Sequence, residues 1–183
     1  RRVNLKFMTI QINYTSNSTK KISSNFIQFV DEKFNLSGLK KVIPNHEYLY
    51  ILDLLKTSDL KKDVLFFKIN SKRTIYLVSI KNDKKANDLE GLGAKFFDLA
   101  KNEKHNEYYL NSESINKIEN LVIYFLHGLR LKSYEFEKYK SKKNKKNISI
   151  NIIGNGIKIS SQNQLKFKAL EEGIFFARDL VSE

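Results

Sequence analysis

The sequence predicts an α/β domain in which a mixed central sheet is sandwiched between helices. Short runs rich in Val, Ile, Phe and Tyr alternate along the chain with segments whose apolar residues recur every three or four positions. This alternation of strand and helix signals favours a layered fold. The 183 residues, of which 41% are hydrophobic, are enough for one well-buried core and few for two.

The first third of the chain predicts two strands and one helix. Residues 5–12 alternate as a strand at an edge or under partial cover, and a polar loop over 13–21 leads to a second strand over 26–30. Ser37 is placed to cap a short helical turn that ends at Lys41. Pro44, the only proline, suits the first position of a helix. The apolar stripe of that helix comprises Tyr48, Ile51, Leu52 and Leu55.

The middle of the chain contains the clearest strand pair. Residues 64–69 and 74–80 are both rich in β-branched and aromatic side chains, and 70–73 suit a hairpin turn between them. A helix is expected over 88–101 and a short strand over 107–110. The expected buried face of the helix carries Leu89, Leu92, Phe96 and Leu99.

The best amphipathic helix follows, with Ser112 or Ser114 as its cap. Gly128 is expected to interrupt this helix near its end, and the residues after it are expected to wrap over the core as an extended tail. The apolar residues of the helix are Ile115, Ile118, Val122, Phe125 and Leu129, and those of the tail are Leu131, Tyr134, Phe136 and Tyr139.

The last part of the chain predicts a strand and a helix. A charged connection over 141–147 precedes a strand over 148–153, and Gly154 begins a turn after which 157–159 extend the sheet. A final helix is expected over 162–182. It reaches Glu183 without a glycine cap or proline, so we expect the natural protein to continue.

Composition narrows the function classes. Without cysteine, the chain has no disulfide framework, thiolate metal site or cysteine nucleophile, which fits a reducing, cytoplasmic setting. No apolar run approaches the roughly 20 residues that a membrane-spanning helix needs. A membrane partner is therefore not expected.

The formal net charge of +13 raises the possibility of nucleic-acid binding. Lysine far outnumbers arginine, however, and this composition is typical of an AT-rich genome, whereas arginine makes the bidentate contacts to phosphate and guanine. The one dense basic cluster lacks the interleaved aromatic residues of a single-strand binder. Its members, which stay candidates for nucleic-acid contact, are Lys142, Lys143, Lys145 and Lys146.

No motif marks a reaction centre. His46, His105 and His127 lie outside any metal-ligand spacing, and we expect them to be loop or helix-surface residues. Two Gly-x-Gly triplets, 91–93 and 154–156, do not extend to a dinucleotide or phosphate-binding motif, so turn and packing glycines are expected. No Gly-x-Ser-x-Gly motif is present. Catalytic and metal-binding residues are therefore predicted to be absent.

Two stretches together resemble a known family. The first follows the pattern Gly-x-x-Leu-x-x-Tyr-x-Phe-x-x-Tyr-Lys and comprises Gly128, Leu131, Tyr134, Phe136, Tyr139 and Lys140. The second comprises Gly173, Ala177, Arg178, Asp179 and Leu180. Together they are similar to the N-terminal domain of the leucyl aminopeptidases, or cytosol aminopeptidases. Lys132 and Ser182 depart from the family pattern, which often has Gly and Asn there.

The resemblance implies a macro-domain-like fold over residues 1–160 and a helix over 161–183 that leads towards a C-terminal catalytic domain. In the family, two divalent metals (zinc, manganese or magnesium) lie in that second domain, and its metal motif Asn-Thr-Asp-Ala-Glu-Gly-Arg does not occur here. The resemblance therefore implies a non-catalytic chain without a cofactor of its own. It also implies that the parent is a metallo-aminopeptidase, a hydrolase, that assembles as a homo-hexamer.

Two other functions stay open. One is a basic nucleic-acid-binding module, because of the charge and the lysine cluster. The other is a nucleotide or ADP-ribose binder, which only the macro-like layout and the Gly-x-Gly triplets favour.

Overall fold

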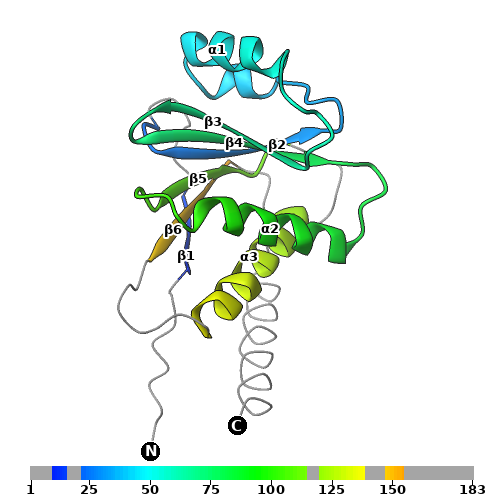
Figure 1. The fold of residues 1–183 in the computed structure, drawn as a ribbon, viewed down its shortest axis with the longest axis vertical. Coiled ribbons are helices and arrows are strands. Elements are labelled where there is room, and N and C mark those ends of the chain that lie inside the picture. The colour runs from blue at the N-terminus through cyan, green and yellow to red at the C-terminus, as the bar shows by residue number, and fades with distance from the viewer. Residues whose placement is uncertain (1–9, 16–21, 115–119, 139–146, 155–183) are drawn as a thin grey trace, which may run out of the picture.

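The computed structural model describes residues 10–15, 22–114, 120–138 and 147–154. Six strands form one sheet in the order β1-β6-β5-β2-β4-β3 (Figure 1). All neighbouring strands run parallel except β3 and β4, which form an antiparallel hairpin at one edge. The predicted mixed sheet is confirmed. The strands are β1 (Ile10–Tyr14), β2 (Asn25–Asp31), β3 (Val64–Asn70), β4 (Arg73–Ile80), β5 (Glu107–Asn111) and β6 (Ile148–Ile153).

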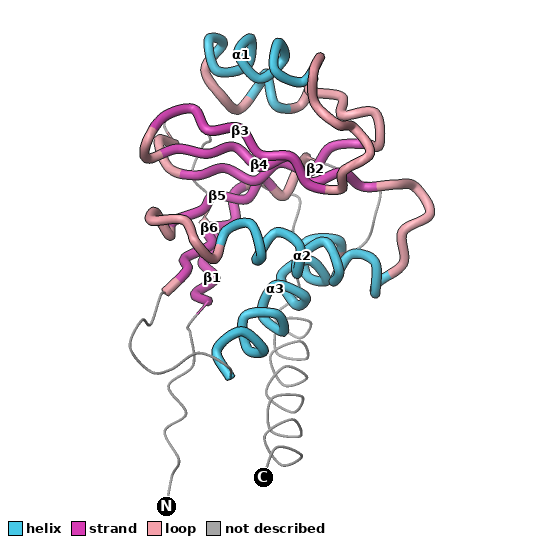
Figure 2. Tube along the Cα trace, viewed as in Figure 1, coloured by secondary structure: helices cyan, strands magenta, loops and turns pink. Residues whose placement is uncertain are grey.

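Helices cover both faces of the sheet, as predicted (Figure 2). The short 3-10 helix η2 and the helix α1 lie over one face, where β2, β4 and β3 supply most of the buried side chains. The helices α2 and α3 lie over the other face and contact residues from every strand. Their bounds are η2 (Leu39–Lys41), α1 (Asn45–Leu55), α2 (Ala86–Ala100) and α3 (Leu121–Lys138).

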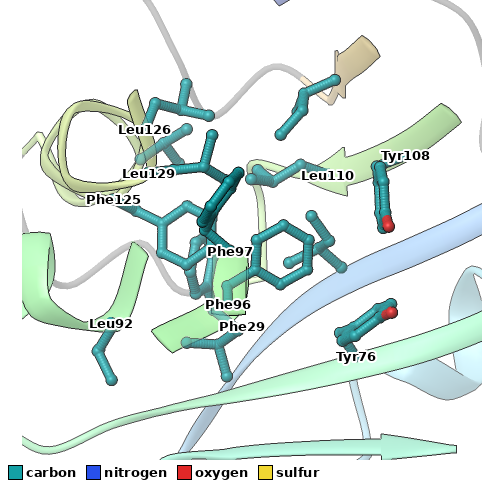
Figure 3. Close-up of a cluster of buried hydrophobic side chains, with 14 of the residues drawn as sticks. Phe29, Tyr76, Leu92, Phe96, Phe97, Tyr108, Leu110, Phe125, Leu126 and Leu129 are labelled. Atoms are coloured by element: carbon teal, nitrogen blue, oxygen red, sulfur yellow. The ribbon is translucent and has the colours of Figure 1, made fainter. Parts of the chain in front are cut away.

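An aromatic cluster occupies the core between the sheet and the helices α2 and α3 (Figure 3). The ring of Phe96 lies 5.0 Å from Tyr76, 5.4 Å from Tyr108 and 5.7 Å from Phe125, measured between centroids. Phe125 also meets Phe29 edge-on at 5.2 Å. Edge-to-face pairs of this kind add to the stabilisation that burial of the rings provides. The strands β4 and β5 are thereby joined to both helices.

Successive side chains of a strand point to opposite faces of the sheet. Ile148, Ile150 and Ile152 of β6 point into the core under α2 and α3. The strand β2 is buried on both faces, with Ile27 and Phe29 towards α2 and α3 and Phe26 and Val30 towards α1. A central strand of a parallel sheet is expected to be apolar on both sides.

The predicted interruption at Gly128 is wrong, because α3 continues through Gly128 to Lys138. Leu131 and Tyr134 therefore belong to a helix and not to an extended tail. Glycine has the second-lowest helix propensity, but tertiary packing overrides that preference here. An added Cβ at Gly128 would lie 1.9 Å from the carbonyl oxygen of Glu90, so only glycine allows the two helices to approach this closely.

The predicted serine caps are also wrong. The hydroxyl of Ser112 donates to the carbonyl of Ile153 at 2.8 Å, which ties the end of β5 to the end of β6. The hydroxyl of Ser114 donates to the carbonyl of Asn111 at 2.7 Å and accepts from the amide of Phe29 at 3.1 Å. Both serines close the loop after β5, and α3 begins at Leu121. Ile115 and Ile118, predicted for the same helix, lie outside the described residues.

The structure also differs from the prediction in where some helices begin and in which of their residues are buried. Ser37 does not cap the turn, because Gly38 precedes η2 without a side-chain cap, and Pro44 stands one position before α1. Leu52 and Leu99, predicted to be buried, are exposed. The structure buries Phe97 and Ala100 on α2 in place of Leu99. The buried stripe continues from Leu92 in steps of three and four residues and leaves Leu99 at its margin.

The first predicted strand is confirmed over residues 10–12. β1 extends past the predicted end to Tyr14 and lies at an edge of the sheet, as the sequence favoured. The predictions for 5–9, 157–159 and 162–182, and the division of the chain near residue 160, lie outside the described residues.

Candidate functional site

Gly128, the first residue of the family motif, lies where α2 and α3 are in contact. An added Cβ at Gly93 of α2 would lie 2.0 Å from the carbonyl oxygen of Phe125, and Gly128 has the corresponding contact with Glu90. The two helices thus touch backbone to backbone at two points. Gly93 fits the expectation that the Gly-x-Gly triplets serve packing or turns, and Gly154, with a φ of +92°, forms a turn.

A buried acid–imidazole pair lies beside this contact. Nδ1 of His127 lies 2.9 Å from Oε1 of Glu90, and the His127 side chain is 6% exposed. The prediction of a surface imidazole is therefore wrong for His127, although it is confirmed for His46 and His105, which are exposed. His127 is buried where its ring meets Glu90 across the contact between the two helices. No local pattern in the sequence reveals this pair, because its two residues are 37 positions apart.

Among the residues that the structure describes, the pair lacks the third group that nucleophilic catalysis needs. A general base activates a hydroxyl that lies within hydrogen-bond distance of its free ring nitrogen. Nε2 of His127 is buried, and no described residue hydrogen-bonds to it. In the described part of the chain, the pair therefore acts as a polar contact between α2 and α3.

A second buried ion pair links α1 to the sheet. Nε and Nη2 of Arg73 donate to Oε2 of Glu47 at 3.1 and 3.0 Å. Nη1 of Arg73 donates to the carbonyls of Ile22 at 2.7 Å and Ser24 at 2.5 Å. The guanidinium thus joins α1, the start of β4 and the segment that enters β2, with side chains only 3% and 8% exposed. The sequence analysis missed this pair, which joins residues 26 positions apart.

A row of polar side chains crosses the half of the sheet that α1 does not cover. Nε2 of Gln11 donates to Oδ1 of Asn13 at 3.3 Å, and Nδ2 of Asn13 donates to Oδ1 of Asn151 at 3.1 Å. Nδ2 of Asn151 donates to Oε1 of Glu107 at 3.2 Å. The hydroxyl of Tyr109 also donates to this carboxylate, at 3.1 Å. Every donor in the row points towards Glu107, so the row joins β1, β6 and β5 by their side chains as well as their backbones.

Two tyrosine hydroxyls are buried in the aromatic cluster. Tyr76 and Tyr108 are 1% and 0% exposed, and their rings lie 5.9 Å apart, measured between centroids. Burial raises the pKa of both tyrosines well above the ordinary value of 10.0, and the negative charge of Glu103 adds to each shift. The two phenols are therefore held in their neutral form.

The predicted site residues are placed only in part. Gly128, Leu131 and Tyr134 lie on α3, where Gly128 and Tyr134 are buried. Phe136 belongs to the same helix, but its side chain is not described. The remaining predicted residues lie outside the described part of the chain: Tyr139, Lys140, Lys142, Lys143, Lys145, Lys146, Gly173, Ala177, Arg178, Asp179 and Leu180.

Two searches of the described residues bear on function. In residues 10–15, 22–114, 120–138 and 147–154, no group of three or more His, Cys, Asp or Glu side chains is arranged to hold a metal ion. None of the helices that the structure describes has the length and apolar character that crossing a membrane requires.

Comparison with solved structures finds proteins of a similar fold. The structure is similar to that of a mutant tomato leucine aminopeptidase, with a TM-score of 0.70 and 15% sequence identity. The match covers 98% of this chain and 39% of the tomato chain, so this chain spans well under half the length of that enzyme. No family profile and no curated protein sequence matches. The shared fold is an α/β fold, as the sequence predicted.

Proposed function

We propose that this chain is the non-catalytic N-terminal domain of a leucyl aminopeptidase, with a role in assembly or regulation. The observation that supports this most directly is the coverage of the structural match, which takes in nearly the whole chain but only 39% of the tomato enzyme. The motif that begins at Gly128 supports the same assignment independently, because it was recognised from the sequence. A fold alone does not fix a function, and the two observations carry the proposal together.

The parent protein, in this proposal, removes N-terminal residues from peptides with two divalent metals in its C-terminal domain. Zinc, manganese or magnesium would activate a water molecule and polarise the scissile carbonyl. The partners of this chain would then be its own catalytic domain and further subunits of a cytoplasmic homo-hexamer.

The use of polar side chains in the described residues is consistent with a supporting role. Glu47 and Arg73 neutralise each other, Glu90 pairs with His127, and the carboxylate of Glu107 accepts from its neighbours on the sheet. Each of these groups joins two or more elements of the fold. The buried Glu47 and the half-buried Glu90 thus have structural partners, and so does the exposed Glu107.

A peptidase assay of the purified 183-residue chain tests the proposal. With Zn²⁺, Mn²⁺ or Mg²⁺ present, we expect no hydrolysis of leucine p-nitroanilide, while a characterised two-metal aminopeptidase serves as the positive control. Metal-dependent hydrolysis that elutes with the chain through two chromatographic steps would overturn the assignment. The gene sequence downstream of Glu183 is the complementary test, since an encoded Asn-Thr-Asp-Ala-Glu-Gly-Arg motif is expected there.

A further inference from the structure

No strand in the described ranges pairs with the outer edge of β3. β3 is the last strand of the sheet, with β4 as its only neighbour among the described residues. The amide of Ser79 donates to the carbonyl of Asp63 at 2.8 Å, and these residues lie opposite each other in the register of the hairpin. In an antiparallel pair, hydrogen-bonded and non-hydrogen-bonded positions alternate. Hence Leu65 and Phe67 bond to β4, whereas the N–H and C=O groups of residues 64, 66 and 68 point outwards.

The side chains at this edge are apolar and partly exposed. The stretch Val-Leu-Phe-Phe over 64–67 contains no charge, and Phe66 is 45% exposed although it lies at the centre of the strand. Leu99 of α2 is also exposed, at 36%. Ion pairs bracket these two residues, because Lys95 meets Asp63 before Phe66 and Lys68 lies 3.7 Å from Glu103 after it. Phe66 and Leu99 are therefore two exposed apolar residues that lie between the same two ion pairs, beside the outer edge of β3.

Natural sheets usually protect such an edge with charges, bulges or a cover. In the described part of the chain, charged residues stand at both ends of β3, and an irregularity in the pairing between Lys68 and Asn70 ends the regular ladder. The four residues before it keep a regular register with β4. An edge of this composition, left open, is suited to pair with another extended segment.

The charges around the edge identify the kind of segment that fits. Lys61, Lys62 and Lys72 are exposed at the two ends of β3, and the chain as a whole carries +13. A second copy that paired its β3 with this one would bring its own Lys61, Lys62 and Lys72 to the same edge and be repelled there. An acidic segment would instead meet these lysines while its apolar residues cover Phe66 and Leu99.

We propose that β3 is a docking edge that binds an extended segment of another protein with alternating acidic and apolar residues. The segment joins the sheet as an additional strand and bonds to the outward N–H and C=O groups of Val64, Phe66 and Lys68. The proposal goes beyond the assignment to a peptidase domain and does not depend on it. If the chain did hydrolyse leucine p-nitroanilide, the assignment as a non-catalytic domain would fall, but the proposal for β3 would stand.

A labelled peptide provides the first test. We expect a fluorescein-labelled peptide of alternating Val and Glu to raise its anisotropy on addition of the chain, and the same peptide with Lys in place of Glu not to do so. Binding should weaken as salt is added, since the charges lie at the surface. Equal binding of both peptides, or binding of neither, would contradict the proposal.

Amide exchange locates the bound peptide. In the free chain, the amides of Val64, Phe66 and Lys68 should exchange quickly, and the acidic peptide should slow their exchange by about tenfold or more. The inward amides of Leu65 and Phe67 are the internal control. Protection of the outward amides that grows with protein concentration, without peptide, would instead identify a second copy as the occupant and overturn the proposal.

A matched pair of variants tests the backbone contact. Phe66→Pro removes one outward N–H and leaves the bonds to β4 in place, because proline is tolerated at the solvent side of an edge strand. Phe66→Ala keeps the N–H and removes only the ring. We expect about a tenfold or greater loss of peptide affinity for Phe66→Pro and a smaller loss for Phe66→Ala. Unchanged affinity in a folded Phe66→Pro chain would refute strand addition; if that variant does not fold, the exchange experiment decides.

Discussion

The buried guanidinium of Arg73 shows how a single side chain can hold three segments together. It satisfies one carboxylate and two backbone carbonyls at once, from α1 and from the segment that leads into β2. Desolvating such a charge costs several kcal/mol, and only a complete set of partners offsets this cost. The stability of the α1 side of the sheet therefore depends on Glu47.

Glu47→Ala is predicted to destabilise the chain by about 3–5 kcal/mol, because it leaves the Arg73 charge buried without its counter-ion. Asp53→Ala in the same helix is the matched control. Asp53 pairs with Lys56 at 3.2 Å, but both side chains are more than 70% exposed, so a change of no more than about 1 kcal/mol is expected. Urea unfolding followed by circular dichroism measures both values. Similar losses of unfolding free energy in the two variants would show that the buried ion pair stabilises the fold no more than the exposed one.

At the scale of elements, the packing of α2 on α3 depends on glycines that serve as contact surfaces. Gly93 and Gly128 let each helix backbone reach the other. Any side chain at either position would have to push the helices apart, because the opposing atoms belong to the backbone and cannot rotate away.

Gly128→Ala is predicted to lower the free energy of unfolding by about 1–3 kcal/mol through this overpacking. Gly91→Ala provides the control on α2, since an added Cβ there meets no atom within 4 Å. There the better helix propensity of alanine should stabilise the chain by about 0.5–1 kcal/mol. Thermal unfolding of both variants should thus show shifts of opposite sign. If Gly128→Ala were also stabilising, the close contact between the helices would be wrong.

The sequence could predict elements that carry a local signal, but not contacts between residues far apart in the chain. The strands β2 to β6 were recognised because each carries its own signal of β-branched and aromatic residues, and the stripe of Leu89, Leu92 and Phe96 placed α2 on the core. Gly128 was misread because its role depends on Glu90, 38 positions earlier, and a local pattern does not contain that contact. His127 was misread for the same reason. The pairing of Arg73 with Glu47 was likewise invisible to any local rule.

For the molecule as a whole, the sheet order could not be predicted either. Alternating strands and helices favoured a mixed sheet, and the fold class followed from that pattern. The insertion of β6 between β1 and β5 is set by long-range pairing, which the composition of each strand leaves open. The predicted residues beyond 154 lie outside the described part of the chain, so the second family motif stays a prediction from the sequence.

Global stability is predicted to fall at alkaline pH because of the two buried tyrosines. In the unfolded chain, Tyr76 and Tyr108 release their protons near pH 10, whereas burial raises their pKa in the folded chain. Above pH 10 the unfolded state therefore binds fewer protons than the folded state, and stability decreases as pH rises. Below pH 10, each phenol contributes its full share to the free energy of unfolding. Above pH 10, this contribution falls by about 1.4 kcal/mol per pH unit.

Unfolding free energies measured between pH 8 and the alkaline limit of reversible unfolding check this expectation. Above pH 10, each buried tyrosine should lower the free energy of unfolding by about 1.4 kcal/mol per pH unit. The double variant Tyr76→Phe, Tyr108→Phe should show a shallower decline than the unmodified chain. Tyr50→Phe changes an exposed tyrosine and should leave the decline as it is. Lysine titration affects all three chains alike and cancels in the comparison. Identical slopes in all three would show that the phenols ionise in the folded state.

The pairing of β1 with β6 has a consequence for synthesis on the ribosome. Asn13 and Asn151, which hydrogen-bond across these strands, are 138 positions apart in the chain. Translation at about 5–20 residues per second would separate their emergence by roughly 7 to 28 seconds. The first strand to be made is thus among the last to find its place, and until then the nascent sheet must end at β5.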